Sequence, residues 1–199
     1  MRPSTRPPSP PAGGAAVELS AVLLDLDGTI TDSAPAIVAS FSATFADLGI
    51  AVPDHATLMG FVGPPLADTF AHYAGLTGPE GARAAALYRS HYRELMHRAP
   101  VYEGMPELVR SLHDAGVPLA LATSKRESLA RQIIERAGLG PCFTAVAGAA
   151  DDDRGGAKAT VIARALTLLS AAGAGTGRTV HVGDRRYDVD GARQAGVEC

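Results

Sequence analysis

The sequence predicts an α/β fold: a doubly wound, Rossmann-like parallel sheet with an inserted helical cap subdomain. The first observation is a series of short apolar segments that alternate with amphipathic segments of helical length. The second observation is that residues 33–100 interrupt this alternation with helical patterns alone. We therefore expect a core made of residues 17–32 and 101–199, and a helical cap made of residues 33–100.

The core elements follow one another in a regular order. Residues 21–26 form the first predicted strand, because a short and nearly all-apolar segment is typical of a strand buried on both faces. Three similar strands follow, and helices with apolar residues on one face lie between them. The later strands are predicted at residues 117–122, 143–148 and 178–182, and the core helices at residues 105–115, 127–137 and 157–169.

Within the cap, helical patterns cover residues 36–48, 65–74 and 81–97. Tyr88 and Tyr92 lie four residues apart on the last of these predicted helices, and we interpret them as packing residues. The whole chain contains 37 alanines and no tryptophan. We therefore expect hydrophobic cores built from small and aliphatic side chains, with few aromatic residues.

The two ends of the chain differ from the rest. Residues 1–16 hold five of the fourteen prolines and no apolar stretch, so we predict a disordered tail and no secretory signal. The sequence stops at Cys199, shortly after its last acidic motif. We therefore expect the C-terminal edge of the sheet to be incomplete.

Composition also restricts the partners of the protein. Lysine and arginine total 18 against 21 acidic residues, so the chain offers no basic field for nucleic acid. No apolar run reaches the roughly 18 residues that a membrane-spanning helix requires. Cys142 and Cys199 form neither a metal-binding spacing nor a disulfide framework. We expect a cytoplasmic protein that binds neither nucleic acid nor membrane, and a weak homodimer is left open.

Acidic residues follow the first and the last predicted strands. Asp25 and Asp27 lie two residues apart at the end of the first strand, and Asp184 and Asp188 follow the last one. Because parallel strands end at one edge of the sheet, we expect four carboxylates to converge there. Four carboxylates in one place repel one another, and a bound cation would offset this repulsion. A site with oxygen ligands alone favours Mg²⁺ over zinc. The simpler alternative of an Asp residue at a helix N-terminus applies most to Asp188.

A hydroxyl group and an ammonium group are expected beside these carboxylates. Thr123 and Ser124 follow the second strand, and Lys158 begins the helix after the third strand. Groups of these two kinds stabilise the charge that spreads over the oxygens of a phosphoryl group during its transfer. The combination indicates phosphoryl-transfer chemistry, and Lys125, next to Ser124, is left without a role.

The order and strand-end position of these motifs resemble the haloacid-dehalogenase-like hydrolase superfamily across residues 20–197. The predicted cap lies between the first two motifs, where this superfamily places its cap. The segments FVGPPLADTF at residues 61–70, ATSK at residues 122–125 and GDRRYD at residues 183–188 look like the phosphoglycolate-phosphatase-like and 5'-nucleotidase-like branch. The residues that match the four motifs are Asp25 with Asp27, Thr123, Lys158, and Asp184 with Asp188.

The resemblance implies a Mg²⁺-dependent phosphatase that hydrolyses a small phosphorylated metabolite, of the phosphoglycolate or nucleoside monophosphate type. It implies that Asp25 attacks phosphorus to form an aspartyl phosphate and that Asp27 acts as general acid and base. An acidic residue at position 27 favours phosphate esters over the dehalogenases of the superfamily. A phosphosugar mutase and a catalytically silent binding module of the same fold stay open as alternatives.

The resemblance also implies the ligands of the site. Phosphate oxygens would be bound by Thr123, Ser124 and Lys158. The Mg²⁺ ligands would be Asp25, Asp184 and the backbone carbonyl of Asp27, with Asp188 in support of the metal site.

Overall fold

The computed structural model describes residues 19–64, 66–151 and 154–199, so the predicted tail at residues 1–16 lies outside the described residues. Its centre is a four-stranded sheet in the order β3-β2-β1-β4. All three strand pairings are parallel, which confirms the predicted α/β fold. The strands are β1 (Ala21–Leu24), β2 (Leu119–Arg126), β3 (Ala145–Ala149) and β4 (Thr179–Val182).

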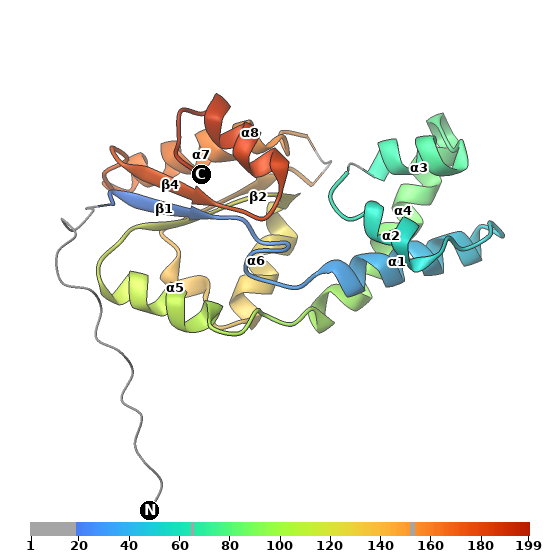
Figure 1. Cartoon of the computed structure of the whole chain (residues 1–199), viewed down its shortest axis with the longest axis horizontal. Coiled ribbons are helices and arrows are strands. Elements are labelled where there is room, and N and C mark those ends of the chain that lie inside the picture. Colours follow the sequence, from blue (N-terminus) through green and yellow to red (C-terminus); the bar gives the residue numbers. More distant parts are fainter. Residues whose placement is uncertain (1–18, 65, 152–153) are drawn as a thin grey trace, which may run out of the picture.

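Helices cover both faces of the sheet (Figure 1). Helices α5 (Met105–Asp114) and α6 (Glu127–Arg136) pack on one face, where Leu24 of β1 joins the buried cluster. Helices α7 (Lys158–Ala171) and α8 (Arg186–Gln194) pack on the other face, against a cluster that includes Leu23. Successive side chains of β1 thus enter opposite layers, as expected for a strand buried on both faces.

The other helices form a separate lobe beside the carboxyl ends of the strands (Figure 1). This cap lobe consists of α1 (Ala34–Asp47), α2 (His55–Gly60), α3 (Leu66–Ala74), α4 (Gly78–Leu95) and the short 3-10 helix η1 (Met96–Arg98).

The interior of the cap lobe is aromatic, which corrects the expectation of small and aliphatic cores throughout. That expectation holds for the two clusters on the faces of the sheet. The chain instead concentrates its aromatic residues between α1, α3 and α4, where the rings contact one another. The residues in these ring contacts are Phe41, Phe45, Phe61, Phe70, Tyr73, Tyr88 and Tyr92.

The structure adds one helix to those predicted and lengthens one predicted strand. Helix α2 was not expected, because its six residues are too few to show a helical period. Its local signal is Asp54, whose carboxylate accepts a hydrogen bond of 2.8 Å from the backbone N–H of Thr57 and so caps the helix. Strand β2 continues to Arg126, past the predicted end at residue 122, and its pairing with β3 is irregular between Ala122 and Arg126.

Strand β4 has a further parallel partner on its outer side. Glu198 forms a single bridge with Val180, and its carbonyl accepts a hydrogen bond of 2.8 Å from the N–H of His181.

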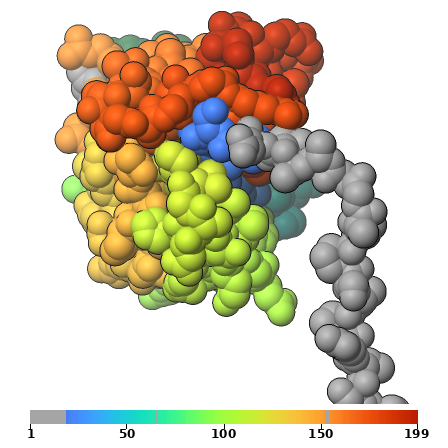
Figure 2. All heavy atoms as spheres, turned by 90° about the vertical axis from the view of Figure 1, so that its left-hand side faces the viewer, coloured from blue at the N-terminus to red at the C-terminus, as the bar shows by residue number. Residues whose placement is uncertain are grey.

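Seen from the amino ends of the strands, the segment around β1 lies between the orange to red C-terminal part and the yellow-green segment of α5 (Figure 2). Among the described residues, no helix combines the length and apolar character needed to cross a bilayer.

Candidate active site

The carboxyl ends of β1 and β4 bring three aspartates together. Leu24 pairs with Val182, and the N–H of Asp25 donates a hydrogen bond of 2.9 Å to the Val182 carbonyl. Asp184 and Asp188 follow β4 at the same edge, so carboxylate oxygens of the three aspartates lie within 4.8 Å of one another. Three of the four carboxylates that were expected to converge therefore do so.

Lys158 lies between two of these carboxylates. From the first position of α7, its Nζ lies 2.9 Å from Oδ1 of Asp25 and 2.8 Å from Oδ1 of Asp188. The same ammonium donates a hydrogen bond of 3.2 Å to the carbonyl of Ala122 in β2. All three charged side chains are buried, and a Cβ at Gly191 of α8 would overlap the stem of Lys158. The glycine therefore lets α7 and α8 approach closely enough to hold this lysine.

Asp25 carries an incompletely compensated charge. Burial raises the pKa of its carboxyl group above the usual value, although the ammonium of Lys158 acts in the opposite direction. Its Oδ1 contacts Lys158 as an ion pair, but in a geometry that leaves this buried oxygen without a hydrogen bond. A buried carboxylate oxygen of this kind is available to a further electrophile or cation.

Asp188 is held more completely than Asp25. His181 Nε2 lies 2.9 Å from its Oδ1, and the backbone N–H of Arg185 donates to its Oδ2 at 3.0 Å. Burial alone would raise its pKa, but the hydrogen bonds from His181 and Lys158 outweigh burial and lower the pKa to about 2. The contact with Arg185 caps the start of α8, so Asp188 has a structural role as well as its contact with Lys158.

The donor set of this edge fits a divalent metal ion. Asp25, Asp184 and Asp188 present oxygen atoms alone, as Mg²⁺ and similar hard cations prefer. Oδ1 of Asp25, which accepts no hydrogen bond, and the partly exposed Asp184 could accept further ligands from solvent or substrate. A Cβ at Gly28, whose φ is +83°, would overlap the Asp184 carboxylate, so a glycine at this turn leaves the space that Asp184 occupies.

Asp27 is not a member of this acidic group, and its side chain binds a different lysine. Lys125 Nζ lies 2.8 Å from Oδ1 and 2.6 Å from Oδ2 of Asp27, and it donates a hydrogen bond of 2.6 Å to the hydroxyl of Tyr92. Burial alone would lower the pKa of Lys125, but Asp27 and Tyr92 outweigh it and raise the pKa above the usual range. Tyr92 belongs to α4, so this contact joins the core to the cap lobe.

Thr123 and Ser124 lie on β2 between Ala122, whose carbonyl accepts from Lys158, and Lys125. Thr123 is buried, and its hydroxyl accepts a hydrogen bond of 3.2 Å from the N–H of Lys125. Ser124 is exposed. All the residues predicted for the site therefore lie at the carboxyl edge of the sheet, with Asp27 turned toward the cap lobe and the other aspartates around Lys158.

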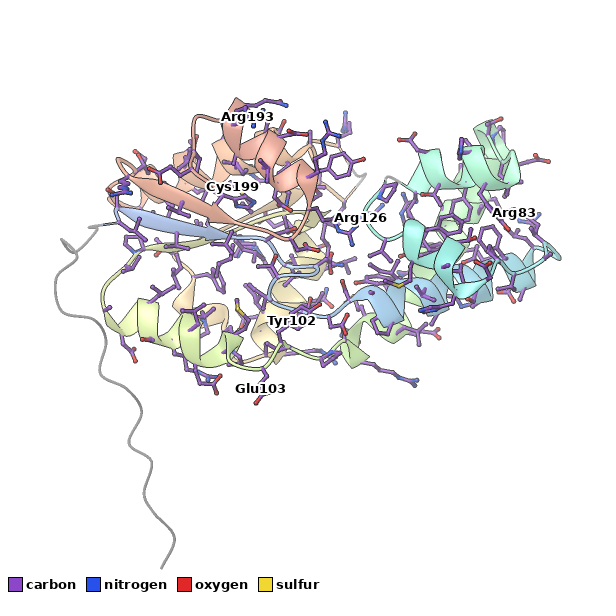
Figure 3. The ribbon with its side chains drawn as sticks, in the orientation of Figure 1. Arg83, Tyr102, Glu103, Arg126, Arg193 and Cys199 are labelled. Atoms are coloured by element: carbon purple, nitrogen blue, oxygen red, sulfur yellow. The ribbon has the colours of Figure 1, made fainter. Side chains whose placement is uncertain are left out.

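A second contact joins the cap lobe to the acidic edge. Arg185 donates a hydrogen bond to the carbonyl of Val62, which lies in the FVGPPLADTF segment, and its side chain lies 3.6 Å from Asp184. Arg126, at the end of β2, marks the same junction between the two lobes (Figure 3).

The sequence interpretation gave Lys125 no role, treated Tyr92 only as a packing residue, and did not place Arg185 in the site. The composition contained one signal that could have drawn attention to Lys125. The chain has sixteen arginines but only two lysines, Lys125 and Lys158. Both lysines contact aspartates of the site. Tyr92 and Arg185 gave no comparable signal, because their partners come from segments far away in the sequence.

Comparison with known proteins agrees with this geometry. The family model of haloacid dehalogenase-like hydrolases matches residues 22–199. The chain belongs to this family. The match includes both aspartate pairs and both lysines, so the resemblance drawn from the motifs is confirmed at the level of the family.

Curated relatives within the haloacid dehalogenase-like hydrolases carry different names. The chain is 34% identical over 186 residues to a 5'-nucleotidase of Pseudomonas aeruginosa, covering 93% of this chain and 83% of that protein. It is 39% identical over 178 residues to the tyrosine-protein kinase PtkA of Mycobacterium tuberculosis. That match covers 89% of this chain, which spans 60% of the length of PtkA.

Solved structures of the haloacid dehalogenase-like hydrolases share the fold. The structure of a predicted phosphatase from Clostridium acetobutylicum superimposes with a TM-score of 0.80 at 35% sequence identity. The superposition covers 90% of this chain and 83% of that one, so it includes both the sheet and most of the cap lobe.

Proposed function

We propose that the chain is a Mg²⁺-dependent phosphatase that hydrolyses a small phosphomonoester through an aspartyl-phosphate intermediate on Asp25. The observation that carries the proposal is the acidic group of Asp25, Asp184 and Asp188 around the ammonium of Lys158. Family membership and phosphatases among the relatives support a phosphoric monoester hydrolase.

In the first step, a carboxylate oxygen of Asp25 attacks the phosphorus atom of the ester. A bond forms between Asp25 and phosphorus while the bond from phosphorus to the ester oxygen breaks. Asp27 donates a proton to the departing ester oxygen, which leaves as an alcohol. The buried position of Asp25 favours this reaction, because a poorly solvated carboxylate loses little hydration when it attacks.

In the second step, Asp27 acts in the reverse sense. Its carboxylate takes a proton from a water molecule, whose oxygen attacks the phosphorus of the aspartyl phosphate. The bond between phosphorus and Asp25 breaks, so inorganic phosphate leaves and the Asp25 carboxylate is restored. Asp27 is the suitable residue, because its side chain is turned out of the acidic group toward the cap lobe.

Positive charge would balance the phosphoryl oxygens in both steps. Lys158 supplies a buried ammonium beside Asp25, and the hydroxyl groups of Thr123 and Ser124 add hydrogen bonds. Asp25, Asp184 and the backbone carbonyl of Asp27 would hold Mg²⁺, with Asp188 in support. When bound, the metal ion supplies further neutralisation of negative charge on the phosphate.

The proposed partner is a small phosphorylated metabolite. The 5'-nucleotidase relative and the FVGPPLADTF segment support nucleoside monophosphates or 2-phosphoglycolate as the first compounds to test. The composition and the free cysteines support a cytoplasmic location.

The test is phosphate release from p-nitrophenyl phosphate and from a panel of nucleoside monophosphates, 2-phosphoglycolate and sugar phosphates. We expect turnover with Mg²⁺, its loss in excess EDTA, and its return when Mg²⁺ is restored. Asp25→Asn should abolish turnover while leaving circular dichroism unchanged.

Other outcomes would identify the alternatives. Folded protein without turnover on any compound would contradict the phosphatase and favour a silent binding module. Exchange of phosphate between positions of a sugar phosphate, without net release, would favour a mutase. Transfer of phosphate from ATP to tyrosine, the activity named for PtkA, would also contradict the proposal if phosphate release were absent.

A further inference from the structure

We propose that Lys125 is a positioning residue for Asp27, and that Tyr92 of the cap lobe holds Lys125 in place. Docking of the cap lobe would then orient the group that transfers protons to and from the substrate. This inference rests on the proposed function of Asp27 and adds the control of its orientation by the cap.

The contacts of Lys125 carry the argument. Its Nζ lies 2.8 Å from Oδ1 and 2.6 Å from Oδ2 of Asp27, so the ammonium contacts both oxygens of the carboxylate. A carboxylate gripped at both oxygens cannot rotate freely about its last torsion. The remaining hydrogen bond of Lys125, at 2.6 Å, goes to the hydroxyl of Tyr92.

Burial strengthens the electrostatic contacts of Lys125. The side chain of Lys125 is 8% exposed and that of Asp27 is 25% exposed, so the pair is poorly screened by water. The ammonium also lies over the Tyr92 ring, 4.5 Å from its centroid, which adds a cation–π contact. A compact ammonium fits among these three acceptors, whereas the flat, forked guanidinium of arginine requires a different arrangement.

The backbone of β2 is shaped to aim this side chain. Pairing of β2 with β3 is irregular between Ala122 and Arg126, and such irregularities redirect side chains beside active sites. The Thr123 hydroxyl accepts from the N–H of Lys125 within this segment. A Cβ at Gly148 of β3 would lie 2.7 Å from the Lys125 carbonyl, so only glycine permits this close approach.

The cap end of the contact is equally well fixed. Tyr92 stacks on Tyr88, with ring centroids 5.9 Å apart and planes inclined by 7°, and both rings are buried in the aromatic cluster of the cap lobe. Tyr92 therefore moves with the cap lobe, while Lys125 and Asp27 belong to the core. Separation of the lobes would remove one of the three acceptors of Lys125.

The experiment compares substrates with good and poor leaving groups. The value of kcat/KM is measured for p-nitrophenyl phosphate, whose leaving group needs little protonation. It is also measured for the alkyl phosphomonoester that the unmodified chain hydrolyses fastest. Misplacing a general acid affects the alkyl ester selectively, and this contribution is typically about 10² to 10⁴-fold. We expect Lys125→Met to lower kcat/KM about 100-fold for the alkyl ester and less than about 5-fold for p-nitrophenyl phosphate.

Tyr92→Phe tests the cap end without removing a charge. It keeps the ring stack and deletes the hydroxyl that Lys125 uses, so we expect the alkyl ester to lose about 5-fold in kcat/KM. Tyr88→Phe is the matched control, because Tyr88 lies on the same helix and in the same ring stack. Tyr88→Phe should leave the ratio of the kcat/KM values for the two substrates unchanged. Thermal unfolding of every variant separates loss of folding from loss of positioning.

Each result has a clear meaning. Equal loss for both substrates in folded Lys125→Met would overturn the proposal, because a merely structural role affects both. If Tyr92→Phe leaves the ratio of the two kcat/KM values unchanged, the proposed role of the cap lobe in holding Lys125 is wrong. If Lys125→Met does not fold, Tyr92→Phe still decides that part, and Lys125→Arg tests the positioning role with the charge retained. Absence of phosphate release by the unmodified chain would instead refute the proposed function.

Discussion

The two lysines of the chain divide the candidate site into an inner and an outer half. In the inner half, every partner of Lys158 belongs to the core: Asp25, Asp188 and the carbonyl of Ala122. In the outer half, Lys125 joins Asp27 of the core to Tyr92 of the cap lobe. The inner half is therefore built by the sheet alone, whereas the outer half is complete only when the two lobes are in contact.

The largest effect is expected from the inner half. Asp25→Asn keeps the size of the side chain but removes the nucleophile, so kcat should fall at least about 10⁴-fold for every substrate. Steady-state phosphate release measures this loss. Asp190→Asn on α8 is a matched control, because Asp190 makes its ion pair with Arg186 on the surface. A variant of Asp25 that retained one tenth of the activity would remove the basis for the inner half as the reaction centre.

Removal of the inner lysine tests how this half is stabilised. Lys158→Met leaves Asp25 and Asp188 buried and without their shared cation, so the free energy of unfolding should fall by about 3 kcal/mol. Urea unfolding measures the change, and added Mg²⁺ should restore part of it by binding the freed carboxylates. No loss of stability would contradict the view that the inner half depends on this lysine.

The pKa of Asp188 predicts an acid-labile contribution to stability. Because the folded-state pKa is lowered to about 2, the ionised form stabilises the fold at pH values above the ordinary pKa of 3.8. This contribution, about 2 kcal/mol, should be lost as the pH falls from about 4 toward 2. Unfolding free energies of the unmodified chain and Asp188→Asn should therefore converge at low pH. A constant difference between them would contradict the assignment.

The smallest effect is expected from the backbone that supports the outer half. Gly148→Ala inserts a Cβ against the Lys125 carbonyl and should reduce stability by about 1 kcal/mol. It should also lower kcat/KM for an alkyl ester more than for p-nitrophenyl phosphate. Gly60→Ala on α2 is the control, because a Cβ there meets no atom within 4 Å and alanine favours helices. Equal behaviour of the two variants would show that β2 tolerates displacement of Lys125.

The sequence was sufficient to predict the fold and most of the inner half. Short apolar segments indicate strands that are buried on both faces. The residues that follow parallel strands lie at one edge of the sheet, independent of the conformation of the loops. Asp25, Lys158 and Asp184 could therefore be placed from their positions alone. The outer half could not be placed in this way, because the contact of Lys125 with Tyr92 depends on how the cap lobe rests on the core. The aromatic interior of the cap also escaped prediction, since an average composition hides where each residue type is concentrated.

The aromatic interior gives the protein a built-in optical reporter. The chain contains no tryptophan, and three of its five tyrosines lie on α3 and α4. The other two, Tyr102 and Tyr187, lie outside the cap lobe and are 40% and 60% exposed. Near-ultraviolet dichroism should therefore report mainly on the cap lobe, where Tyr73, Tyr88 and Tyr92 contact other rings. A movement of the cap lobe that breaks the contact between Tyr92 and Lys125 should change this signal, so no attached dye is needed to detect it.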